Sequence, residues 1–139
     1  MIKTYNENGQ KAYQRQDRED RSLKYRMWLR TIDTDGFFMD IDFIKWKFLD
    51  GAPVPVAITE ITRCDSENIN DNYLRAIIDR WYVRDKQAEI IKTLATLLVV
   101  PAYLICYQKD MLWLEVFDLQ TEKWTKFTPQ EWATFLRKL

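Results

Sequence analysis

Histidine is absent from this 139-residue sequence, and glycine and cysteine are scarce, with three and two residues respectively. Without imidazole, the chain lacks Ser-His-Asp and Cys-His nucleophile systems, histidine general bases and metal sites that need histidine. Three glycines leave no glycine-rich phosphate loop, and Cys64 and Cys106 are too few for a disulfide framework or a zinc ribbon. A metal ion would have to bind oxygen ligands, which favours Mg²⁺, Mn²⁺ or Ca²⁺.

An excess of either charge is also absent, because 21 Lys and Arg balance 21 Asp and Glu. The chain therefore has no generic basic coat for DNA. The most apolar stretch, Leu94–Tyr107, is shorter than a membrane span and contains Pro101. The polar N-terminus shows no signal peptide. These features predict a single domain over residues 1–139 that is soluble and cytoplasmic, without membrane association, and whose residues 1–10 form a flexible arm.

Hydrophobic periodicity and turn residues predict helices and strands in alternation. Turn signals at Asp50-Gly51 and Lys109-Asp110 indicate two hairpins, and Thr128-Pro129 indicates the start of a helix. The expected helices are Lys11–Arg30, a region from Asn70 to Leu98 broken near Val83–Lys86, and Thr128–Leu139. The expected strands are Phe37–Phe48, Val54–Arg63, Ala102–Tyr107, Leu112–Leu119 and Lys123–Phe127. This order predicts the α/β (α+β) class, with a mixed β-sheet flanked by helices.

The first hairpin carries the candidate chemistry, because acidic residues lie among its apolar ones. If its turn is centred on Gly51, Asp42 lies opposite Glu60 and Asp40 lies opposite Thr62. Directly opposed side chains have Cβ atoms about 4.5–5.5 Å apart, so the carboxylates would repel unless a cation lies between them. The hairpin is apolar on both faces, which predicts a central position covered by helices. The alternative is that these acids lie on a solvated face or pair with lysines.

The segments Asp40–Ile44 and Pro55–Thr62 resemble the PD-(D/E)xK superfamily of restriction-endonuclease-like nucleases. The resemblance implies that Asp42, or alternatively Asp40, binds a metal ion together with Glu60 and the Ile61 carbonyl. It further implies a restriction-endonuclease-like fold, a catalytic set of Asp42, Glu60 and Thr62, and Mg²⁺ or Mn²⁺ as cofactor. The activity implied is hydrolysis of phosphodiester bonds in DNA, or less readily RNA, and a homodimer would let such an enzyme cut both strands.

Thr62 departs from the family pattern, which has a lysine at that position. Arg63, Lys45 or Lys86 could supply the missing positive charge, although strict alternation turns the first two to the other face. A second metal ion could also neutralise charge. In the alternative reading the site has decayed, and the domain binds nucleic acid or a protein partner without cutting.

Basic residues interleaved with aromatic ones mark the first predicted helix. Residues 1–30 carry eight Lys and Arg against four acids, whereas residues 31–60 carry two lysines against six acids. Such residues can neutralise phosphates while aromatic rings stack on bases, and a solvated helix face is the alternative. The candidate nucleic-acid-binding residues are Arg15, Arg18, Arg26, Arg30, Lys86 and Gln87.

Overall fold

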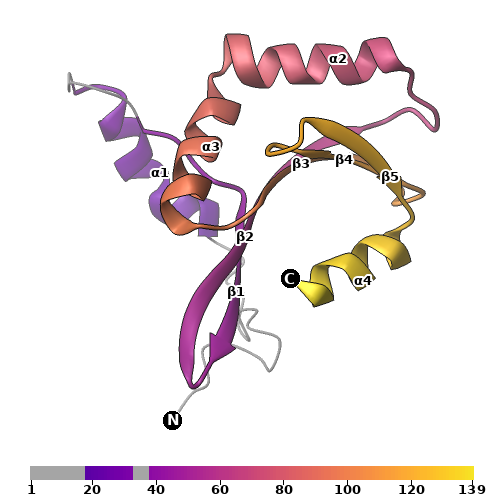
Figure 1. Cartoon of the computed structure of the whole chain (residues 1–139). Coiled ribbons are helices and arrows are strands. Elements are labelled where there is room, and N and C mark those ends of the chain that lie inside the picture. The colour runs from indigo at the N-terminus through magenta and orange to yellow at the C-terminus, as the bar shows by residue number, and fades with distance from the viewer. Residues whose placement is uncertain (1–17, 33–37) are drawn as a thin grey trace. The chain divides into compact units, whose positions relative to one another are not determined.

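The chain forms two compact units, residues 1–40 and 41–139. The structure, a computed structural model, describes residues 18–32 and 38–139, with only the backbone for 18–21 (Figure 1). The first unit contains helix α1, Arg18–Leu29, which matches the later part of the predicted helix. The beginning of that predicted helix and the predicted flexible arm lie outside the described residues.

The second unit has the predicted mixed α/β architecture. Its five strands are β1 (Phe43–Leu49), β2 (Ala52–Cys64), β3 (Ala102–Gln108), β4 (Leu114–Asp118) and β5 (Lys123–Phe127). They form one sheet in the order β1-β2-β3-β4-β5, in which only the β2–β3 pair is parallel. A parallel pair needs a long crossover. Helix α2 (Asp71–Asp79), the π-helix η1 (Arg80–Arg84) and helix α3 (Gln87–Leu98) provide it, and α4 (Pro129–Lys138) ends the chain (Figure 1).

The β1–β2 hairpin combines a tight turn with a β-bulge. Asp50 and Gly51 both have positive φ, 51° and 81°, as a two-residue type I′ turn requires. This turn is one residue shorter than a turn centred on Gly51. The bulge then leaves Val56 without a partner on β1, which restores the predicted register beyond it. Phe43 consequently pairs with Thr59, and the next position brings Asp42 opposite Glu60 as predicted.

Two expectations about this hairpin are wrong. Residues 38–42 are not a strand, so Asp40 has no place opposite Thr62, whose partner is Cys106 on β3. The hairpin is also not central, because β1 is the edge of the described sheet and β2 pairs with β3 only from Ile58 onward. Before Ile58 the hairpin is a two-stranded ribbon. Within the described part of the chain, apolar side chains near its turn stay open to solvent, and Phe48 is 62% exposed.

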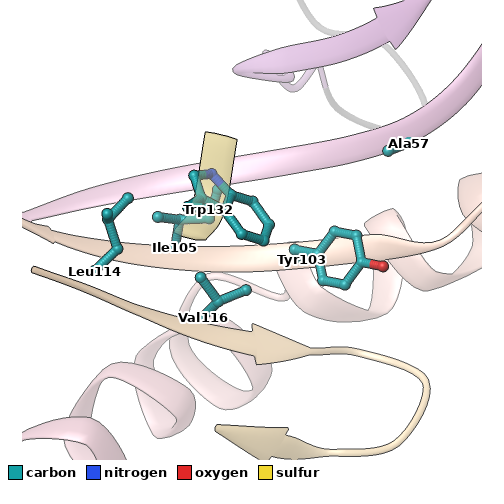
Figure 2. Packing of buried hydrophobic residues seen from close by; sticks show 6 residues of the cluster. All are labelled: Ala57, Tyr103, Ile105, Leu114, Val116 and Trp132. Atoms are coloured by element: carbon teal, nitrogen blue, oxygen red, sulfur yellow. The ribbon is translucent and has the colours of Figure 1, made fainter. Parts of the chain in front are cut away.

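Helices cover both faces of the sheet where it has several strands. One face includes Ile58, Leu104 and Cys106, all fully buried. The helical crossover lies on this face, because the Arg80 side chain reaches Thr62 there. On the other face α4 packs its Trp132 into a cluster with Ala57, Tyr103, Ile105, Leu114 and Val116 (Figure 2). The sheet core is therefore closed on both sides.

Local signals begin and end the helices as the sequence predicts. The Asn70 side chain accepts a hydrogen bond from the Tyr73 N–H, and the Thr128 hydroxyl accepts one from the Glu131 N–H. The crossover changes direction after Asp85, where Lys86 takes a left-handed φ of 58°. The predicted break near Val83–Lys86 is thus confirmed, and it separates η1 from α3.

Candidate functional site

The candidate site lies directly before the first residue of β1, where β2 continues past the last β1–β2 pair. The Asp42 carboxylate accepts a hydrogen bond from the Ile61 N–H, with Oδ2 and N 2.9 Å apart. In return, Glu60 Oε1 accepts one from the Asp42 N–H at 3.2 Å. These crossed bonds satisfy backbone donors beyond the last ladder pair. They join Asp42 to Glu60 through the Asp42 N–H, and Asp42 to Ile61 through the Asp42 carboxylate.

Main-chain geometry adds a third oxygen to this edge. In a β-strand the N–H and C=O of one residue point to the same side. Because the Ile61 N–H reaches the Asp42 carboxylate, the Ile61 carbonyl faces the same edge. Asp42 is exposed, whereas Glu60 is only 3% exposed. The arrangement therefore presents one solvent-facing and one buried carboxylate, a hard oxygen donor set of the kind that Mg²⁺ and Mn²⁺ prefer.

Asp40, the alternative metal ligand, belongs to the first unit and is exposed. In the described ranges, no three side chains of His, Cys, Asp or Glu are grouped so that they could hold a metal ion. An ion at Asp42 and Glu60 would therefore complete its shell with the Ile61 carbonyl and water. Mg²⁺ commonly binds in this way, through one or two carboxylates while keeping several waters.

Thr62 has a cationic neighbour that the sequence did not reveal. The Arg80 guanidinium donates from Nη2 to the Thr62 hydroxyl over 3.1 Å. Glu60 and Thr62 are two positions apart on β2, so their side chains lie on the same face. The arginine from η1 therefore contacts the face of β2 that carries Glu60 and Thr62. One signal was available: the helical period places Arg80 three residues after buried Ile77, at the border of the apolar stripe.

The three cations suggested by the sequence have other positions. Arg63 forms an ion pair with Asp65 at 2.8 Å. The Lys45 ammonium donates to the Leu136 carbonyl on the opposite face, as strict alternation predicted. Lys86 is exposed and precedes α3. None of these contacts brings a positive charge to Thr62, whereas the Arg80 guanidinium contacts its hydroxyl.

The residue paired with Thr62 on β3, Cys106, is shielded from solvent. Cys106 is fully buried, and burial, with Cys64 close by, raises its pKa to about 12. The thiol therefore stays protonated at neutral pH and is a poor nucleophile or metal ligand. The chemistry of this region consequently rests on carboxylates, a hydroxyl and a guanidinium.

The predicted nucleic-acid-binding residues are divided between the two units. Arg15 lies outside the described residues, and only the backbone of Arg18 is described. Arg26 donates to the Ser22 hydroxyl within α1, and exposed Arg30 follows that helix. In the second unit, Lys86 and Gln87 begin α3. Their proposed binding role stays a prediction.

Comparisons with protein-family models, curated proteins and solved structures found no match to this chain. None of the helices in the described ranges combines the length and the apolar character needed to cross a membrane.

Proposed function

We propose that this protein hydrolyses phosphodiester bonds in DNA, or less readily RNA, with Mg²⁺ or Mn²⁺ as cofactor, in the manner of restriction-endonuclease-like nucleases. The observation that supports the proposal is the pair of crossed hydrogen bonds that joins Asp42 to Glu60 and Ile61 at the sheet edge. It brings together the two residues that the resemblance implies as metal ligands.

Each residue has a distinct part in this proposal. Asp42 and Glu60 would hold the ion, and the Ile61 carbonyl would add a neutral oxygen. The bound ion would activate water and stabilise the leaving oxygen. In the reaction a water oxygen bonds to phosphorus, the bond to the leaving oxygen breaks, and the proton passes to that oxygen. Glu60 is buried, and a cation bound to its carboxylate there would interact with it more strongly than in water.

Metal binding is the first test. We expect Mn²⁺ to raise the melting temperature of the wild type, because a ligand that binds only the folded state stabilises it. Asp42→Ala and Glu60→Gln should lose this rise. Asp110→Asn is the matched control, since it removes an exposed carboxylate from the β3–β4 turn. An unchanged wild-type melting temperature, or a full rise in Asp42→Ala, would refute the metal site.

The second candidate function is a decayed nuclease that binds nucleic acid or a protein partner. Two observations favour it: Thr62 replaces the family lysine, and backbone hydrogen bonds already give both carboxylates a structural role. Incubation of DNA and RNA with Mg²⁺ separates the candidates. Cleavage by the wild type that Asp42→Asn removes supports the active enzyme. Cleavage by the Thr62→Lys variant but not by the wild type supports the decayed nuclease. If neither protein cleaves, both the active and the decayed nuclease are contradicted.

A further inference from the structure

Arg80 occupies an unusual place in the helical crossover. It is the first residue of η1, where the Asp85 N–H donates to the Arg80 carbonyl five residues back at 2.8 Å. Such wide turns recur at functional sites in proteins. Trp81, the next residue, is buried, with 3% of its surface exposed. The Arg80 side chain, in contrast, extends toward Thr62 at the candidate site.

The guanidinium of Arg80 retains binding capacity. It offers five N–H donors in a planar fork. Among the described residues its polar partners are the Thr62 hydroxyl at 3.1 Å and the Asp85 carboxylate, whose Oδ2 lies 3.9 Å from Nε. The second distance is too long for a hydrogen bond. The side chain is 36% exposed, so solvent and ligands can reach it.

We propose that Arg80 binds the phosphate group of a nucleic-acid substrate beside the Asp42–Glu60 edge, and that Thr62 positions its guanidinium. The inference rests on the proposed function for the nature of the ligand. A phosphodiester that approaches two carboxylates is repelled unless positive charge compensates it. Arg80 supplies that charge on the face that Glu60 and Thr62 share.

The chemistry of the two side chains favours phosphate. A guanidinium fork matches phosphate oxygens with two parallel hydrogen bonds, which a lysine cannot reproduce. The Thr62 hydroxyl holds one nitrogen of the fork and carries no charge, so it orients the arginine without neutralising it. A carboxylate at position 62 would instead compete with the substrate.

The test measures DNA affinity separately from cleavage. A fluorescently labelled DNA duplex is titrated with the full-length protein in Ca²⁺, and fluorescence anisotropy reports binding. We expect Arg80→Gln to weaken binding about tenfold or more, because a hydrogen bond to a charged group is lost. Its salt dependence should also become shallower by about one released counterion. Arg84→Gln is the control, since Arg84 lies in the same η1 turn but is largely exposed and pairs with Asp85.

Thr62 variants test positioning in case Arg80→Gln folds poorly. Thr62→Val keeps the shape of the side chain and removes the hydroxyl, so we expect DNA affinity to fall about threefold to fivefold. Thr62→Ser restores the hydroxyl and should restore affinity, which a merely structural role of the methyl group would not explain. Equal losses in Arg80→Gln and Arg84→Gln, or full affinity in Thr62→Val, would overturn the inference.

Failure of this inference and failure of the proposed function have different signatures. Wild-type binding that depends on Arg80 without any cleavage in Mg²⁺ keeps the phosphate site and rejects the nuclease. Cleavage that survives in Arg80→Gln with unchanged affinity keeps the nuclease and rejects Arg80 as its phosphate-binding residue. A wild type that neither binds nor cleaves DNA or RNA rejects both.

Discussion

The two ends of the β1–β2 hairpin differ in which side chains they bury. At the turn end, Phe48 is an aromatic residue with 62% of its surface exposed. At the other end, Glu60 is a carboxylate with 3% of its surface exposed. Phe48 lies on β1 and Glu60 on β2, so both residues have extended backbone. The difference comes from what surrounds each end.

The neighbouring strands and helices explain why an aromatic side chain is exposed and a carboxylate is buried. Near Glu60, strand β2 has β3 alongside and the helical crossover above it. Near Phe48, no third strand of the described ranges flanks the ribbon, because β3 begins opposite Ile58. Burial here follows tertiary neighbours more closely than side-chain hydrophobicity. A buried carboxylate that accepts a backbone hydrogen bond marks the end of the hairpin where function is expected.

The largest expected effect compares core and ribbon directly. Ile58→Ala should lower the free energy of unfolding by about 2–5 kcal/mol, because it opens a cavity in a fully buried site. Phe48→Ala should change it by less than about 0.5 kcal/mol. Urea denaturation followed by circular dichroism measures both. A large loss of unfolding free energy in Phe48→Ala would mean that the ribbon is covered in solution. The proposed difference between core and ribbon would then be wrong.

An effect of intermediate size is the loss of stability at alkaline pH that the buried Cys106 thiol causes. The pKa of Cys106 rises from 9.0 to about 12 on folding, so the unfolded state releases this proton first. Its contribution to stability is complete below pH 9 and is lost as the pH rises toward 12. We expect about 1 kcal/mol of loss by pH 10. Denaturation of the wild type and Cys106→Ala from pH 8 to 10 should show a steeper decline in the wild type, and equal slopes would contradict this expectation.

The smallest expected effect concerns how the ribbon is attached to α4. Lys45 donates to the Leu136 carbonyl in the last turn of that helix, a place where cations are favourable. Lys45→Met should lower the free energy of unfolding by about 0.5–1 kcal/mol. The neighbouring variant Lys47→Met provides the control and should stay within about 0.3 kcal/mol. Equal melting temperatures for the two variants would show that the contact does not stabilise the protein.

Much of the fold could be predicted because its signals are local. Asp50-Gly51, Asn70 and Thr128 carry their turn or cap preference in their own side chains, and each acts where predicted. The strand Lys123–Phe127 matches its predicted bounds. The prediction of a strand before Phe43 was wrong because an alternating sequence pattern does not by itself supply a partner strand.

The predicted Asp42–Glu60 pairing was correct for a reason that sequence could not fully supply. The turn is shorter by one residue than assumed, and the bulge at Val56 compensates for it. Nothing in the local sequence announces that bulge. The central placement of the hairpin was wrong for a related reason, since apolar residues on two faces do not reveal how many strands lie beside them.

By itself, the sequence determined the chemistry available to this protein: no imidazole, few thiols, and carboxylates among apolar strand residues. It also determined the turns, caps and strand periods, because these depend on neighbouring residues in the chain. Only the tertiary structure decided which carboxylate is buried and that Arg80 meets Thr62 across 18 positions of sequence. Such a contact depends on how a crossover helix packs on a sheet, and that packing is a property of many side chains together.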